Sequence, residues 1–279
     1  MLKRPDDART SEQVMQHYEV ERGLAGVLRD APRERRLGLY SQLYDELFQR
    51  VPTHPQLTRK SSPADTRELV DQQMRFLRRF LSPGATFLEV GAGDCTLSAE
   101  VAAHVERVYA VDVSVEVASA GALPANGELV LSDGCSIPVP PNSVDVAYSN
   151  QLMEHLHPDD AEEQLRNLHR ALAPGGRYVC VTPNRLNGPH DVSQYFAYDA
   201  CGFHLKEYTT GELRRLFSSV GFRESIAHVR VLGRFYAVPN WLPAMAERVL
   251  ELLPRKLSRA LARRVPFRWV LGIYLVGVK

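Results

Sequence analysis

Residues 87–96 read Phe-Leu-Glu-Val-Gly-Ala-Gly-Asp-Cys-Thr, an apolar run that leads directly into a Gly-x-Gly turn. Two glycines allow the backbone to turn tightly and a ligand to approach without a Cβ in the way. A dinucleotide fingerprint needs a third glycine three residues after Gly93, where this chain has Thr96. No Lys-Ser or Lys-Thr pair follows the glycines, so the stretch is not a P-loop. The turn therefore predicts a ligand-binding strand end without naming the ligand.

Further apolar runs recur on both sides of this turn and alternate with helical patterns. Strands are expected at 86–90, 108–111, 129–131, 144–148 and 177–182, and helices at 97–104 and 158–172. Apolar strands that alternate with helices predict an α/β fold with a mostly parallel sheet covered on both faces. Residues 226–231 and 270–278 are expected to add a final antiparallel pair.

Polar side chains close three successive strands of this pattern. Asp112 lies about 20 residues after Gly91, the spacing expected of an acid that binds a ribose. Asp133 follows the third strand, and Asn150 ends the fourth. The carboxyl ends of parallel strands line one crevice, so these side chains are expected to converge there. Caps and turns are the alternative role for such aspartates.

These blocks, in this order, resemble the class I S-adenosylmethionine-dependent methyltransferases, in particular type 11-like small-molecule methyltransferases. The resemblance spans about residues 64–230, and its blocks are 88–93, 110–112, 131–134, 143–147 and 169–176. It implies a doubly wound, seven-stranded, mostly parallel Rossmann-like sheet and S-adenosyl-L-methionine as the cofactor.

The resemblance also implies roles for particular residues. Gly91 and Gly93 would pass under the methionine moiety, with Glu89 nearby. Asp112 would bind the ribose hydroxyls, and Asp133 with the backbone of Gly134 would hold the adenine. The rest of the expected cofactor-binding set consists of Ala92, Val113, Asn150 and Gln151.

The segment after the fourth strand, 150–157, is expected to face the transferred methyl group. His155 is a candidate general base because its unperturbed pKa suits proton transfer near neutral pH, and Glu154 is its neighbour. Related enzymes that bind a divalent metal carry Glu-x-x-Glu-His here; Gln151 replaces the first acid, so no metal is expected. His190 or His204 joining Glu154 and His155 would keep a metal site open. Alternatively, Glu154 and His155 orient the loop and cap the next helix.

Residues 182–208 form a long polar and aromatic segment, a candidate binding loop over the ligand end of the sheet. His190 beside Asp191 is the third catalytic candidate, although a turn histidine is an equal alternative. His204 is expected to be structural.

Three regions are expected along the chain: a helical extension over 1–63, the methyltransferase core over 64–232, and a helical insertion with a final strand over 233–279. The insertion contains a basic amphipathic segment that could contact a membrane surface or pack on the core. Its basic residues are Lys256, Arg259, Arg263 and Arg264.

Composition narrows the function. A net charge of +1 gives no general attraction to nucleic acid. Four separated cysteines without a CxxC pair argue against a zinc ribbon. With no leader-like or membrane-spanning run, a soluble cytoplasmic protein is expected. The expected function is methylation of a small-molecule acceptor, with oxygen preferred, in specialised-metabolite or glycan and glycolipid biosynthesis. The alternatives are an RNA methyltransferase and a non-catalytic adenosyl-ligand-binding protein.

Overall fold

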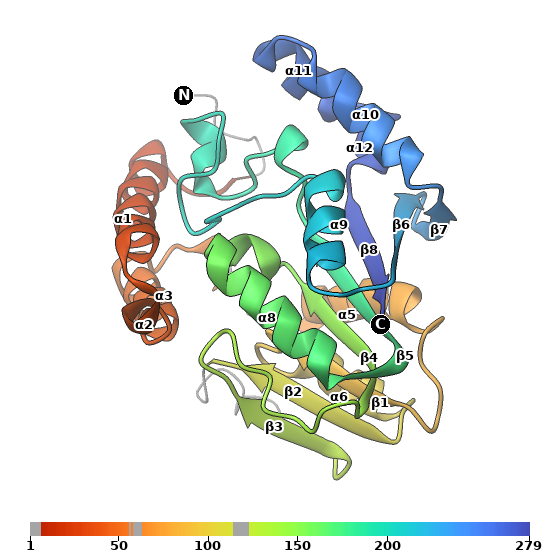
Figure 1. The fold of residues 1–279 in the computed structure, drawn as a ribbon. Helices are drawn as coiled ribbons and strands as arrows, with labels where there is room; N and C mark the ends of the chain where they lie inside the picture. Colours follow the sequence, from red (N-terminus) through yellow and green to blue (C-terminus); the bar gives the residue numbers. More distant parts are fainter. Residues whose placement is uncertain (1–6, 56, 58–62, 114–122) are drawn as a thin grey trace.

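One sheet organises the computed structural model, which describes residues 7–55, 57, 63–113 and 123–279 (Figure 1). Within these residues the sheet has eight strands in the order β3-β2-β1-β4-β5-β8-β6-β7. Their bounds are β1 Thr86–Val90, β2 Arg107–Asp112, β3 Gly127–Leu131, β4 Val144–Asn150, β5 Leu172–Thr182, β6 Glu224–Val231, β7 Arg234–Val238 and β8 Ile273–Val278. Strands β1 to β5 are parallel to one another, whereas β8 is antiparallel to both β5 and β6. The expected α/β class and the antiparallel pair β6 and β8 are confirmed.

The strand count and one helix boundary differ from expectation. The sheet has one strand more than the expected seven because the chain turns back after β6 and adds β7 as an antiparallel edge. The helix expected to run to Leu172 ends at Ala171, and Leu172 already has the extended conformation of β5. Gly175 and Gly176, a pair typical of a helix end, lie inside β5 instead. There a Cβ on Gly176 would come within 2.9 Å of the Val144 carbonyl.

Helices cover both faces of the sheet and form two apolar cores. One face packs against α8 (Pro158–Ala171) and α9 (Thr210–Ser219), and the other against α5 (Pro63–Leu77) and α6 (Thr96–Ala102). Successive residues of β1 point into opposite cores: Leu88 belongs to the first and Phe87 to the second. This alternation is what two-sided burial of a strand requires.

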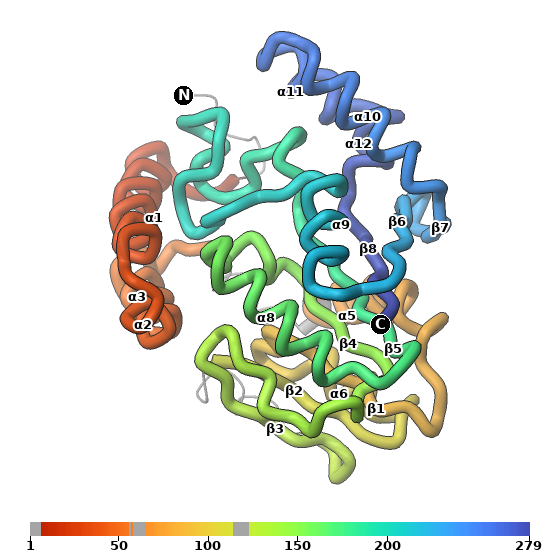
Figure 2. Tube along the Cα trace, in the orientation of Figure 1, coloured from red at the N-terminus to blue at the C-terminus, as the bar shows by residue number. Residues whose placement is uncertain are grey.

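The N-terminal helices α1 (Ser11–Asp30), α2 (Arg33–Arg36) and α3 (Leu39–Arg50) lie together at one side of the core (Figures 1 and 2). A buried ion pair holds them there: the Arg36 guanidinium donates to both carboxylate oxygens of Asp160 on α8, at 2.5 and 2.7 Å. The Tyr40 hydroxyl donates to the same carboxylate at 2.6 Å. These contacts fix α3 beside the start of α8.

The C-terminal helices α10 (Trp241–Glu251), α11 (Arg255–Ala262) and α12 (Phe267–Val270) lie at another side of the sheet, away from α1 to α3 (Figure 2). Arginines of α11 and its C-cap bind the loop at 187–199 of the same chain. Arg259 donates to the carbonyls of Ala197 and Gln194, and Arg263 donates to that of Asn187. Among the described residues, no helix has the length and apolar character needed to cross a bilayer.

Candidate functional site

A cavity of about 250 Å³ opens at the carboxyl ends of β1, β2 and β4. This is the edge where an open parallel sheet binds its ligands. Its wall combines the turn after β1, the ends of β2 and β3, the segment after β4 and one face of α3. The lining residues are Tyr40, Ser41, Tyr44, Asp45, Phe48, Val90, Gly91, Gly93, Val111, Asp112, Val113, Ser132, Gly134, Gln151, Leu152, His155, Leu156 and Gln164.

The glycine turn of this wall is tied to the end of β2. Gly91 and Gly93 have φ values of +75° and +54°, which glycine adopts at little cost. The amide of Gly93 donates to Asp112 Oδ2 at 2.8 Å, and the amide of Gly91 donates to the Val111 carbonyl at 2.8 Å. A Cβ on Gly93 would meet no heavy atom within 4 Å, so the backbone of this turn is open to a ligand.

Six of the ten expected cofactor-binding residues line the cavity: Gly91, Gly93, Asp112, Val113, Gly134 and Gln151. The other four, Glu89, Ala92, Asp133 and Asn150, are outside its lining. The structure therefore brings together the two glycines, the acid after β2 and the glycine after β3.

Two expected acids outside the lining have partners within the protein. Glu89 is buried and accepts a hydrogen bond from Ser98 Oγ of α6 at 2.6 Å; burial raises its pKa to about 8. Asp133 is exposed, and its Oδ1 accepts from the amides of Cys135 and Ser136 at 2.9 and 2.7 Å. These amide contacts lower the pKa of Asp133 although burial opposes them. Asp133 thus stabilises its own turn, which is the alternative role expected for an aspartate at this place.

The contribution of α3 to the cavity was missed by sequence reasoning. Tyr40, Tyr44 and Phe48 stand four residues apart, so they lie on one face of the helix, and all three line the cavity. This aromatic stripe was a signal present in the sequence. Its meaning depends on where α3 docks.

Gln164 of α8 was also missed. It is buried, and its Nε2 donates to the Gly134 carbonyl at 2.6 Å. Its Oε1 is buried and has no hydrogen-bond partner among the described residues. An unpaired buried acceptor in a cavity wall indicates a place for a ligand donor, because leaving such a group unsatisfied costs roughly 1–3 kcal/mol.

His155, of the short 3₁₀ helix η1 (Met153–His155), lines the cavity as expected. Its Nδ1 lies 2.7 Å from the Tyr44 hydroxyl and 3.1 Å from the Phe203 carbonyl oxygen. Because a carbonyl only accepts, this contact favours the tautomer with the proton on Nδ1. Burial and the neighbouring His204 lower the pKa of His155 to about 3, so the ring is neutral at physiological pH.

The other two catalytic candidates lie behind the cavity wall. Glu154 is fully buried, and its Oε2 accepts from Thr182 Oγ1 at 2.8 Å. Burial raises the pKa of Glu154. The amide of His190 donates to Glu207 Oε1 at 2.7 Å, and its Nδ1 lies 3.3 Å from Oε2 of the same carboxylate.

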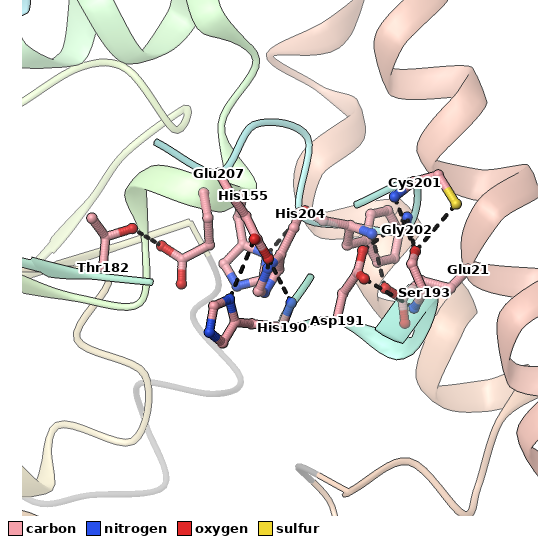
Figure 3. A network of polar contacts seen from close by, with 12 residues as sticks. Glu21, His155, Thr182, His190, Asp191, Ser193, Cys201, Gly202, His204 and Glu207 are labelled. Carbon is pink, nitrogen blue, oxygen red and sulfur yellow. Dashed lines mark hydrogen bonds and ion pairs between the residues drawn. The ribbon is translucent and has the colours of Figure 1, made fainter. Parts of the chain in front are cut away.

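His204 joins this group from the loop before α9 (Figure 3). Its Nδ1 lies 2.7 Å from Glu207 Oε1, and its ring stands edge-on to that of His155 with centroids 4.8 Å apart. Burial opposes a charge on His204, but the contact with Glu207 and the nearby Glu154 and Asp191 raise its pKa to about 9. As long as no other cation binds beside it, His204 is therefore protonated at neutral pH, and a metal ion on its Nε2 would displace that proton.

Comparison with known protein families matches residues 88–180 to the model described as a methyltransferase domain. The chain contains a class I S-adenosylmethionine-dependent methyltransferase domain. Its cofactor is S-adenosylmethionine. The methyltransferase domain matches from Leu88 in β1 to Cys180 in β5, and so includes the glycine turn, Asp112 and η1.

A protein of Mycolicibacterium smegmatis named "Probable S-adenosylmethionine-dependent methyltransferase" is 29% identical over 140 residues, 50% of this chain and 52% of that protein. The chain thus spans about half the length of this relative. A solved S-adenosylmethionine-dependent methyltransferase from Archaeoglobus fulgidus is 17% identical with a TM-score of 0.52, covering 76% of this chain and 94% of its own. Phosphoethanolamine N-methyltransferase 2 from Haemonchus contortus was solved with phosphomonomethylethanolamine and S-adenosylhomocysteine. It is 16% identical with a TM-score of 0.50, and the match covers 75% of this chain and 52% of that one. These likenesses confirm the Rossmann-like fold.

The cavity of the methyltransferase domain fits this cofactor on two observations. The open backbone at Gly93 accommodates close approach of a ligand. The unpaired Oε1 of Gln164 offers a hydrogen-bond acceptor in the same wall.

Proposed function

We propose that the chain transfers a methyl group from S-adenosylmethionine to a hydroxyl group of a small-molecule acceptor. The observation that carries this proposal is the composition of the cavity wall. The glycine turn and Asp112 form one side, and Tyr44, Phe48 and His155 form the other. The chain's own helix α3 contributes Tyr40, Tyr44 and Phe48 to the wall, so an acceptor would lie against aromatic side chains in a cavity of about 250 Å³, which suits a small molecule.

The cofactor would be held by the residues at the strand ends. Gly91 and Gly93 would approach it through their backbone, and Asp112 with Val113 would bind the ribose. Gly134 and Gln164 would border the adenine, with Asp133 close by in the same turn. Ala92, Asn150 and Gln151 would complete the surroundings of the methionine part, while Glu89 would act from behind the turn. When bound, this cofactor supplies a methyl group already activated on a sulfonium.

His155 is the residue that we propose to contact the acceptor hydroxyl. With the proton on Nδ1, its Nε2 carries the lone pair and can accept a hydrogen bond from that hydroxyl. A base whose pKa is about 3 is poorly matched to proton transfer at neutral pH, so this contact would mainly orient the acceptor oxygen. Glu154 and His190 would act indirectly, through the buried charges behind η1.

RNA methylation and membrane contact receive less support, and a non-catalytic role is left to the experiment. Among the described residues, the cavity lining contains no lysine or arginine, the side chains that neutralise RNA phosphates. Membrane contact through the basic face of α11 is weakened because Arg259 and the adjacent Arg263 bind the chain's own loop. A non-catalytic adenosyl-ligand-binding protein would keep the cofactor half of the wall without transferring methyl groups.

The experiment has two parts. Calorimetric titration with S-adenosylhomocysteine, with NAD as the control ligand, measures whether the cofactor half binds. Transfer of labelled methyl from S-adenosylmethionine is then measured on paired phenolic, sugar and glycolipid acceptors that differ only in a hydroxyl or an amine. We expect binding of S-adenosylhomocysteine alone and label on the hydroxyl member. Label only on amines contradicts oxygen as the acceptor atom, and binding without transfer to any acceptor supports the non-catalytic alternative.

A further inference from the structure

A buried group of one carboxylate and two imidazoles lies directly behind the cavity wall. Glu154 and His155 come from η1, and His204 comes from the loop before α9. Each offers one potential ligand atom, and these atoms all lie within 4.8 Å of one another. Glu154 has no exposed surface and His204 is 8% exposed. His155 also lines the cavity, so the group adjoins the place where an acceptor would bind.

Both imidazoles are already oriented through Nδ1. The Nδ1 of His204 faces the Glu207 carboxylate at 2.7 Å, and the Nδ1 of His155 faces the Phe203 carbonyl at 3.1 Å. A carboxylate or carbonyl on one ring nitrogen fixes the tautomer and leaves the lone pair of Nε2 for a metal, the usual arrangement around metal-binding histidines. Both rings thus have the outer hydrogen-bond contact that is typical of metal-binding histidines.

The carboxylate of Glu154 likewise has one oxygen in a hydrogen bond and one oxygen left for a ligand. Glu154 Oε2 accepts from Thr182 Oγ1 at 2.8 Å, whereas Oε1 is buried and finds no hydrogen-bond partner within the part of the chain that the structure describes. An unpaired buried carboxylate oxygen is costly unless a cation or donor satisfies it. Glu207 and Asp191 add further negative charge nearby and are not themselves members of the group.

We propose that Glu154, His155 and His204 bind one divalent first-row transition-metal ion, such as Zn²⁺ or Mn²⁺. Two imidazole nitrogens and one carboxylate oxygen suit these ions, whereas Mg²⁺ and Ca²⁺ prefer sites built from oxygen ligands. Three protein ligands leave a coordination position open, as in catalytic metal sites. Metal binding goes beyond the proposed function and does not depend on it. With the ion on Nε2 of His155, the ion would replace the direct contact between that nitrogen and the acceptor hydroxyl. Only this further role of the ion, holding the acceptor hydroxyl and lowering its pKa, rests on that function.

The sequence predicted no metal because Gln151 stands where related metal-binding enzymes have the first acid of Glu-x-x-Glu-His. Gln151 is exposed and is not part of the group. His204 completes the group instead, and the tertiary fold brings it there from 49 positions beyond His155. A second group among the described residues, His17, Glu21 and His54, carries no such proposal. Both ring nitrogens of His17 are occupied there, by Arg9 and by Glu21.

The direct test uses the full chain, stripped with a chelator and dialysed, in calorimetric titrations with Zn²⁺, Mn²⁺ and Mg²⁺ and without any methyl acceptor. We expect one equivalent of Zn²⁺ or Mn²⁺ to bind and Mg²⁺ to bind at least about 100-fold more weakly. If neither Zn²⁺ nor Mn²⁺ binds with one-to-one stoichiometry, the proposal is wrong, and the group is an ion network in which His204 supplies the positive charge.

Variants locate the site. Glu154→Gln and His204→Asn each remove a ligand and should weaken binding by more than about 100-fold, the upper end of the effect of an outer contact. Glu207→Gln changes the outer contact of His204, together with the contacts that Glu207 makes with His190, and should weaken binding by about 10- to 100-fold. His157→Asn is the matched control: it removes an imidazole two residues from His155 that caps α8 and lies outside the group.

Binding of S-adenosylhomocysteine by each variant shows that it is folded and separates this test from that of the proposed function. Wild-type affinity for the metal in both Glu154→Gln and His204→Asn overturns the assignment of the ligands. Loss of metal affinity in those two variants, with His157→Asn unchanged, supports it.

Discussion

The Tyr44 hydroxyl of α3 lies 2.7 Å from Nδ1 of His155, a residue 111 positions later in the chain. The Tyr44 ring also stacks on Phe203, whose carbonyl faces the same Nδ1. The N-terminal helices are therefore part of the cavity wall. Among the residues that the structure describes, His155 is the one histidine that lines the cavity, and α3 contacts it through Tyr44.

Tyr44→Phe tests whether this contact positions His155. The substitution keeps the ring and removes a hydrogen bond worth roughly 0.5–1.5 kcal/mol, so we expect the rate of methyl transfer to fall by about 2- to 12-fold. Binding of S-adenosylhomocysteine should stay within about twofold because the cofactor side of the wall is unchanged. Tyr18→Phe is the control: it removes a tyrosine hydroxyl contact on α1, to Cys201, outside the cavity lining. A similar loss of rate in both variants would indicate general loosening of the helices.

Asp112→Ala is expected to weaken binding of S-adenosylhomocysteine. The carboxylate holds the Gly93 amide at 2.8 Å and is proposed to bind the ribose, and hydrogen bonds to a charged group are worth roughly 1.5–3 kcal/mol. Calorimetry should show that the affinity for S-adenosylhomocysteine falls by about 10- to 100-fold. Asp145→Ala is a matched control, since Asp145 holds the Thr86 amide at 2.8 Å at the start of β1, the edge opposite the cavity. Equal affinities of the two variants would remove Asp112 from the site.

Gln164→Leu tests which side chain contacts the adenine amino group. The unpaired Oε1 of Gln164 is an acceptor suited to that group, whereas Asp133 Oδ1 already accepts two amides of its own turn. Wild-type protein should prefer S-adenosylhomocysteine over the analogue with an oxo group in place of the adenine amine. We expect Gln164→Leu to reduce this preference by about 2- to 12-fold and Asp133→Asn to preserve it. The reverse pattern would assign the contact to Asp133.

The pH dependence of stability should contain a term from Glu89. Burial raises its pKa in the folded protein to about 8 from an ordinary value of 4.5. Below pH 4.5 the carboxyl is protonated in both states and contributes nothing. Between 4.5 and 8 the unfolded chain releases the proton while the folded chain keeps it, so stability falls as pH rises. The loss approaches about 5 kcal/mol and is constant above pH 8.

Glu89→Gln removes this titration and is compared with wild type by urea unfolding at several pH values. As pH rises from 4.5 to 8, the unfolding free energy of wild type should fall relative to that of Glu89→Gln. If the difference between the two proteins stays constant over this range, Glu89 is already ionised in the folded protein. S-adenosylhomocysteine is left out of these titrations, because a ligand that binds only the folded state adds stability of its own.

Much of the fold could be predicted because its signals are local. The run at 86–90 and the glycine turn after it each depend on neighbouring residues, and both appear in the structure. The edge strand β7 was not predicted. Its pairing with β6 depends on a tight turn at Leu232 and Gly233, both with positive φ, and Leu232 is a residue type that rarely adopts it.

The sequence by itself determined the α/β class, the glycine turn and the convergence of Asp112 and Gly134 on one edge, because parallel strands place their carboxyl ends together. Only the tertiary structure decided that α3 forms part of the cavity wall and that His204 stands beside Glu154 and His155. The docking of α3 depends on the buried pair of Arg36 and Asp160, 124 residues apart. Such long-range pairings depend on how whole elements pack, and the spacing of residues within one segment carries no record of them.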